Sequence, residues 1–169
     1  MGQQINMGIN RIAGIKDDDI EWAYSLADQI TKTPGKMGGL GTKGDAARHL
    51  ALGWLAGQSS LSPEQSTLQR YLGKGWPLAA IQLNETKFFP TKNNVEQAQD
   101  RKNNELGFEL AGIINTKEEF EKTVKDMFSD SSGYSVVKDV EAAKSSKVPV
   151  VLASGTPAYT GSSYKATKQ

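Results

Sequence analysis

The 169-residue sequence contains no cysteine, a single histidine and no long run of apolar residues. Without cysteine the chain forms no disulfide, no thiolate metal site and no cysteine nucleophile. No stretch approaches the run of about 18 apolar residues that indicates a membrane-spanning helix. The polar segment at residues 1–10 lacks the apolar region of a signal peptide, so we expect no secretion signal.

The sequence also has little net charge, because 20 Lys and Arg residues balance 19 Asp and Glu residues and leave a formal charge of +1. We therefore expect no field strong enough to hold nucleic acid or anionic lipid by bulk charge. Two lysines near the end of the chain, Lys165 and Lys168, are too sparse to predict nucleic-acid binding. At this length, the chain fits one compact domain with a real core.

Helix signals recur along the middle of the chain. Acidic residues 17–19 precede apolar residues at helical spacing, and Pro34 with Gly35 ends this first helix. A second helix is predicted from residue 44 to about residue 56, with Gly57 as its C-terminal cap. Four further helices are predicted from capping boxes, a proline in the first turn or apolar stripes, over residues 62–73, 76–90, 95–114 and 116–129.

These signals predict a mainly α fold: a single helical bundle domain of about five to six helices with extended N- and C-terminal arms. The N-terminal arm is placed at residues 1–16, the helical domain at 17–145 and an extended C-terminal tail at 146–169. Within the domain, residues 134–144 stay open between strand and helix, because residues 135–137 favour a strand and 140–143 a helix. The tail holds one β-prone run, residues 148–152, that would pair with something.

Three predicted helices carry polar groups beside their apolar stripes. The groups are Asp45, Arg48 and His49 on the second helix, Glu85 on the fourth, and Asp100, Asn103 and Asn104 on the fifth. A buried ionisable group without a partner is costly, so we expect these helices to meet and their polar groups to satisfy one another. In this prediction Arg48 holds Asp100 bidentately, and His49 exchanges a proton with Glu85.

Such a cluster has a catalytic and an architectural interpretation. In an enzyme, Glu85 and His49 would act as general acid and base, with Asp45 beside His49. In a scaffold, the network would fix the register of the helices without chemistry. Asp45, His49, Glu85 and Asp100 also make a nitrogen-plus-carboxylate set. With one histidine and no cysteine zinc is not favoured, and we expect no metal and no cofactor.

The motifs D-x-x-R-H at residues 45–49, Asn84-Glu85, and D-x-x-N-N-x-x-G at residues 100–107 resemble a helical domain family of uncharacterised function in bacterial and phage-encoded proteins. The resemblance covers about residues 44–112. It implies that the family's invariant-looking positions are Asp45, Arg48, His49, Glu85, Asp100, Asn103, Asn104 and Gly107. The family's second histidine is absent, because Leu83 and Asn84 precede Glu85, so a mechanism that needs two imidazoles would be lost here.

Two functions follow from these patterns. The first is a structural or assembly component of a phage virion, a tail or internal, ejection-associated protein whose arms bind neighbouring subunits and whose polar cluster is architectural. The Gly- and Asn-containing N-terminal arm and the Ser-, Thr- and Tyr-rich tail motivate it. The alternative is a small hydrolase that cuts cell-wall polymer during phage entry with Glu85 and His49. We expect a location in the virion, or alternatively in the cytoplasm.

Overall fold

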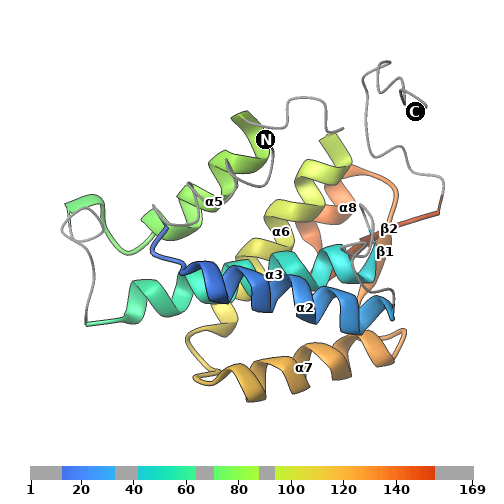
Figure 1. Ribbon diagram of the computed structural model, residues 1–169. Coiled ribbons are helices and arrows are strands. Elements are labelled where there is room, and N and C mark those ends of the chain that lie inside the picture. Colours follow the sequence, from blue (N-terminus) through green and yellow to red (C-terminus); the bar gives the residue numbers. More distant parts are fainter. Residues whose placement is uncertain (1–12, 33–41, 64–70, 88–93, 155–169) are drawn as a thin grey trace, which may run out of the picture.

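The computed structural model describes residues 13–32, 42–63, 71–87 and 94–154, with only the backbone described at 84–87. This part of the chain is mainly helical, which confirms the predicted fold class (Figure 1). Its elements are α2 (Asp17–Thr31), α3 (Lys43–Leu61), α5 (Trp76–Lys87), α6 (Asn94–Leu110), α7 (Lys117–Ser129), β1 (Ser135–Val137), α8 (Val140–Ser145) and β2 (Val150–Leu152). No helix among the described residues is both long and apolar enough to cross a bilayer.

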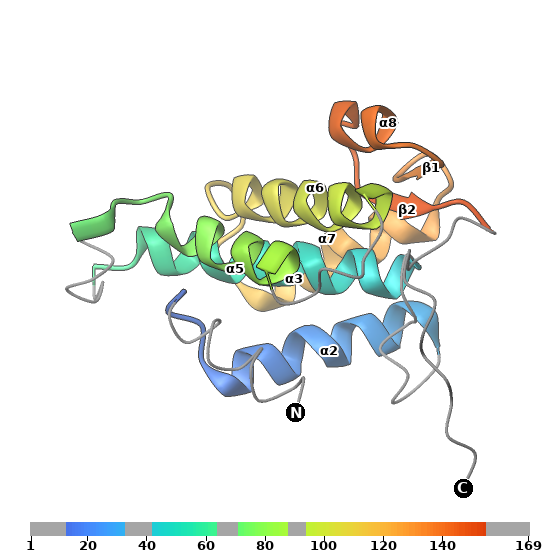
Figure 2. The same ribbon diagram turned by 90° about the horizontal axis from the view of Figure 1, so that it is seen from above.

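Helix α3 is the centre of the fold. It packs against α2, α5 and α6, and Figure 2 shows it between α2 on one side and α6 on the other. Thr42 caps its N-terminus by accepting a hydrogen bond from the Asp45 backbone N–H. The helix continues to Leu61, so the prediction that Gly57 ends it is wrong. Gly57 lies inside α3, and a glycine is needed there because α6 passes close to it. A Cβ added to Gly57 would be 2.9 Å from the Phe108 carbonyl oxygen.

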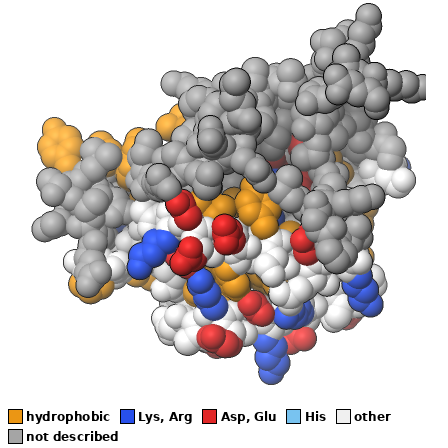
Figure 3. All heavy atoms as spheres, in the orientation of Figure 1, with side chains coloured by type: hydrophobic (Ala, Val, Ile, Leu, Met, Phe, Trp, Pro, Cys, Tyr) orange, Lys and Arg blue, Asp and Glu red, His pale blue; other side chains and the backbone are white. Residues whose placement is uncertain are grey.

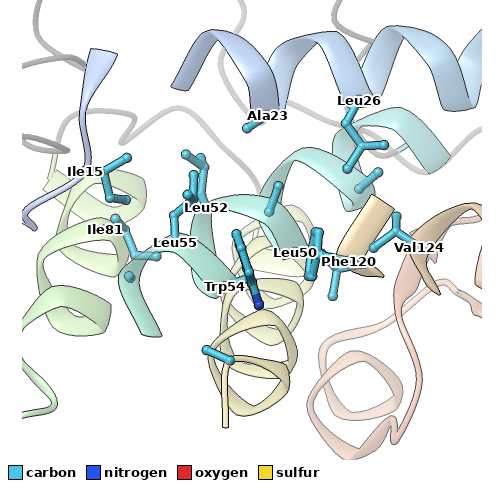
Figure 4. Close-up of a cluster of buried hydrophobic side chains, with 14 of the residues drawn as sticks. Ile15, Ala23, Leu26, Leu50, Leu52, Trp54, Leu55, Ile81, Phe120 and Val124 are labelled. Atoms are coloured by element: carbon cyan, nitrogen blue, oxygen red, sulfur yellow. The ribbon is translucent and has the colours of Figure 1, made fainter. Parts of the chain in front are cut away.

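An aromatic cluster joins α2, α3 and α7. The Trp54 ring stacks on Phe120 at 4.9 Å between centroids, and Trp22 lies 5.8 Å and 5.9 Å from these two rings. Figure 4 shows Trp54 and Phe120 among the aliphatic side chains of the core. Phe120 is completely buried, and burial of one such side chain contributes about 1.5–3 kcal/mol. This cluster fixes α7 against the two N-terminal helices.

Helix α6 ends at Leu110, four residues before the predicted end at residue 114. The chain turns there, so Ile113 lies outside the helix and is 75% exposed. Ile114 is buried instead, and its carbonyl oxygen accepts hydrogen bonds from Trp54 Nε1 at 3.0 Å and Gln58 Nε2 at 2.8 Å. Two side chains of α3 thus hold the turn in place.

Helix α7 begins as its capping box predicts, with the Thr116 hydroxyl accepting from the Glu119 backbone N–H. Its buried residues are Phe120, Val124 and Phe128, at i, i+4 and i+8. Met127 is only partly buried, because Phe128 continues this stripe.

The segment left open between strand and helix forms both, first β1 and then α8. β2 pairs with β1 in parallel, with Ser135 opposite Val150 and Val137 opposite Leu152. β2 lies in the segment predicted as the C-terminal tail, and its Val150 and Val151 are buried, so the β-prone run pairs within the chain. The N-terminal side also packs inward at Ala13 and Ile15. Most of the helix predicted over residues 62–73, and the arms at 1–12 and 155–169, lie outside the described residues.

The face in Figure 3 carries acidic and basic side chains interspersed over its lower part. This mixture agrees with the formal net charge of +1.

Candidate functional site

The candidate site lies where α3 and α6 cross, and glycines set the distance between the two helices. A Cβ added to Gly53 would lie 2.8 Å from the Asn104 carbonyl carbon, and one added to Gly107 would lie 2.8 Å from the Leu50 carbonyl carbon. Neither position has room for a side chain, so the two backbones touch. This approach brings the polar groups one turn before each glycine together in the interior.

His49 is the centre of the polar groups. Its Nε2 lies 3.1 Å from Asp100 Oδ1 and 3.7 Å from Asp45 Oδ1, and its Nδ1 lies 3.3 Å from Asn104 Oδ1. His49, Asp45, Asp100 and Asn104 are all at least 99% buried. The convergence expected of the second and fifth predicted helices is therefore present in α3 and α6.

Arg48 closes this group on the side of α2. Its Nη2 lies 2.5 Å from Asp45 Oδ1 and 2.7 Å from His49 Nε2, and its guanidinium carbon lies 5.6 Å from the centre of the Tyr24 ring. The Arg48 side chain is 13% exposed. Among the described residues, Arg48 thus contacts Asp45, and Asp100 faces His49. The predicted bidentate pair between Arg48 and Asp100 stays a prediction.

The hydrogen-bond partner on Nδ1 defines the state of the His49 ring. The Asn104 amide oxygen only accepts, so Nδ1 carries a hydrogen and donates it. Nε2 then either accepts from Arg48 as a neutral imidazole or carries a second proton that faces Asp100. The hydrogen bond to Asn104 therefore fixes Nδ1, and Nε2 faces the Arg48 guanidinium and the Asp100 carboxylate.

Asn103 belongs to a separate network, although it is adjacent to Asn104. Its Oδ1 accepts from the Val150 backbone N–H at 2.8 Å, and its Nδ2 donates to the Val150 carbonyl at 2.9 Å. Gln99 Nε2 donates to the same carbonyl at 3.1 Å. The side-chain amide of Asn103 thus binds β2 as a neighbouring strand would, and its function is structural.

Two buried polar residues of α6 were not found from the sequence. Glu96 and Gln99 are both fully buried. They precede Asp100 and Asn103 by four residues each, the same spacing that singled out Asp45 and His49, so this signal was available.

The Glu85 side chain lies outside the described residues, and only its backbone position on α5 is known. The predicted proton exchange between Glu85 and His49 therefore stays a prediction.

The described surface carries hollows near the candidate site's helices. One, of about 390 Å³, lies between α6 and α8, and another, of about 320 Å³, lies between α6, α7 and the segment before β2. Neither is lined by Asp45, His49 or Asp100. One donor atom from each of these three residues nevertheless lies within 4.8 Å of the others, a set that has the composition of a metal-binding group.

Comparisons with protein-family models, with curated proteins and with solved structures gave no match. The resemblance to the helical domain family therefore stays a prediction.

Proposed function

We propose that this chain is an assembly protein, a helical module that binds neighbouring protein subunits while its buried polar cluster is architectural. Burial is the observation that supports this function. His49, Asp45, Asp100 and Asn104 are at least 99% buried at the α3–α6 crossing, and neither described hollow is lined by them. A buried, mutually bonded network fixes the register of the helices.

The surface offers an apolar groove for such binding, which we name the Ile113 groove. Its lining is mainly apolar, with one acidic and one basic residue, and comprises Leu50, Leu106, Glu109, Leu110, Ile113, Met127, Gly133, Lys147, Val148 and Pro149. Ile113 is 75% exposed. An apolar centre with charged residues beside it has the composition of a protein interface.

The occupant that we propose for the Ile113 groove is a second copy of this chain. Glu109 and Lys147 carry opposite charges in the same groove, so a two-fold pair whose axis passes between them would place Glu109 of one copy against Lys147 of the other. The chain's formal net charge of +1 adds little repulsion between copies. The setting of this assembly, a phage virion in which the terminal arms bind neighbouring subunits, remains the prediction made from the sequence.

Sedimentation velocity of the full chain over a wide range of concentrations tests this proposal. We expect a concentration-dependent dimer that Ile113→Asp abolishes, because the substitution puts an unpaired charge into the interface. Tyr71→Asp is the matched control, since Tyr71 is 87% exposed and lines neither hollow. A monomer at every concentration, or equal dimerisation of Ile113→Asp and the wild type, would contradict the proposal.

One observation favours the alternative, a small cell-wall hydrolase. The Asn104 side chain orients the His49 ring, and the Asp100 carboxylate lies 3.1 Å from His49 Nε2, so an imidazole and a carboxylate, two groups that carry protons in general acid–base catalysis, lie side by side. Lysis of cell-wall suspensions by the wild type, His49→Ala and Glu85→Gln tests this function, with Asn94→Ala as an exposed control on α6. Lysis by the wild type that both site variants lose supports the hydrolase, and equal lysis by all four chains rejects these catalytic residues.

A further inference from the structure

We propose that Asp45, His49 and Asp100 form a binding site for one divalent cation of the Mn²⁺ type, which ties α3 to α6. This site is separate from the Ile113 groove and goes beyond the proposed assembly function. From the sequence we expected no metal, because one histidine without cysteine disfavours zinc. The folded chain adds a spatial observation, the convergence of one imidazole and two carboxylates from two helices.

The spacing of the three donor atoms suits a six-coordinate ion. Adjacent ligands of an octahedral ion with bonds of about 2.1 Å lie about 3.0 Å apart. His49 Nε2 lies 3.1 Å from Asp100 Oδ1 and 3.7 Å from Asp45 Oδ1. The two carboxylates suit a hard ion of the Mn²⁺ or Mg²⁺ type, and the set contains no thiolate.

The hydrogen bond on the far side of the His49 ring also agrees with a metal ligand. Histidines that bind metals usually donate their other ring N–H to a carbonyl or carboxylate oxygen, which fixes the ring and directs the free nitrogen at the ion. The Asn104 side-chain oxygen accepts from Nδ1 in this way and is itself 99% buried. The ring is therefore already oriented with Nε2 toward the two carboxylates.

Arg48 is the competitor that the proposed ion must displace. Its Nη2 contacts Asp45 Oδ1 and His49 Nε2, two of the three proposed donor atoms. Its side chain is also the more exposed part of the cluster, at 13%. We infer that the cation enters as the guanidinium moves toward solvent, so that one positive group replaces another at the same donors.

Because Arg48 competes with the ion, its removal should strengthen binding of the ion. The electron paramagnetic resonance signal of free Mn²⁺ falls when the ion binds, so Mn²⁺ alone is titrated with the full chain. We expect binding by the wild type and at least about tenfold tighter binding by Arg48→Met, which removes the competing cation. We expect Asp100→Asn to lose binding and Asn104→Ala to weaken it by about 10- to 100-fold.

Two substitutions serve as controls. Asp130→Asn removes an exposed carboxylate outside the site, and Asn94→Ala removes an exposed amide from α6. The proposal is overturned if neither the wild type nor Arg48→Met lowers the free Mn²⁺ signal, or if Asp130→Asn weakens binding as much as Asp100→Asn. Circular dichroism checks that each variant folds. If Asp100→Asn does not fold, Asn104→Ala decides: binding equal to that of Asn94→Ala overturns the proposal.

Discussion

Gly53 and Asn104 are in backbone contact across the α3–α6 crossing, so a Cβ at Gly53 would overlap the Asn104 carbonyl group. The same relationship exists between Gly107 and Leu50, where α6 supplies the glycine and α3 the carbonyl group. These reciprocal contacts allow the imidazole of His49 on one helix to face the Asp100 carboxylate of the other. The position of the candidate site thus depends on residues that have no side chain.

The first prediction concerns this crossing. Gly107→Ala should lower the free energy of unfolding by about 3 kcal/mol or more, because the added methyl group meets backbone atoms that cannot turn away as a side chain can. Urea denaturation measures the change. Gly75→Ala is the control, since a Cβ there meets no atom within 4 Å and the stability should stay nearly the same. Equal stability of the two variants would contradict the close crossing.

The second prediction concerns the amide that binds β2. Asn103→Ala removes one acceptor and one donor from Val150, and we expect a loss of about 2 kcal/mol because a buried N–H is left without its partner. Hydrogen exchange of the Val150 amide should accelerate more than that of residues in α7. Asn94→Ala, at an exposed position of the same helix, should change the free energy of unfolding by less than about 0.5 kcal/mol. Unchanged exchange at Val150 would argue against the strand-like role of Asn103.

The third prediction concerns the ion pair between Asp45 and Arg48. Arg48→Met should destabilise the chain by about 3 kcal/mol in metal-free buffer, because it leaves the buried Asp45 carboxylate without its cation. The double variant Asp45→Leu/Arg48→Met should lose less than the sum of the two single variants, since neither charge then remains. A double-mutant cycle from urea denaturation measures this coupling. Strict additivity would show that the two side chains do not interact.

The fourth prediction concerns pH. The Ser132 backbone N–H, and then the Ser132 hydroxyl, hold the pKa of Asp130 below its ordinary value of 3.8. A lowered folded-state pKa stabilises the fold above the unfolded value, and this contribution is lost as the pH falls through the folded value. Ser132→Ala should raise the pKa of Asp130 but leave it below 3.8, because the backbone N–H remains. Carbon NMR titration of the Asp130 carboxyl tests this, and an unchanged midpoint would exclude the hydroxyl contribution.

The sequence predicted those features that are local. Thr116 marks the start of α7 because a capping hydroxyl acts within one turn, and the spacing of Asp45 and His49 places both on one face of α3. The contacts between helices were not predictable in the same way. That His49 faces Asp100 depends on where the two helices cross, and the crossing is set by the contacts of Gly53 and Gly107.

The remaining errors also have physical causes. A glycine often marks the end of a helix, so Gly57 was predicted as a cap. In the structure its missing side chain instead allows α6 to pass close to the interior of α3. The pairing of β2 joins residues that are distant in sequence, so a β-prone run in an otherwise polar segment does not reveal its partner. Glu96 and Gln99 have the same four-residue spacing that singled out Asp45 and His49, but polar residues at this spacing also line solvent-exposed helix faces, and the packing of α6 shows that these two are buried.

The hydrogen bonds of Asn103 limit which strands can pair with β2. Successive residues of a strand direct their backbone groups to opposite edges, and Val150 directs its own away from β1, onto the Asn103 amide. That edge of β2 is closed by a side chain. Among the described residues, the middle residue of β1, Val136, is 60% exposed. A further strand therefore cannot pair with β2 at Val150 without displacing the Asn103 amide.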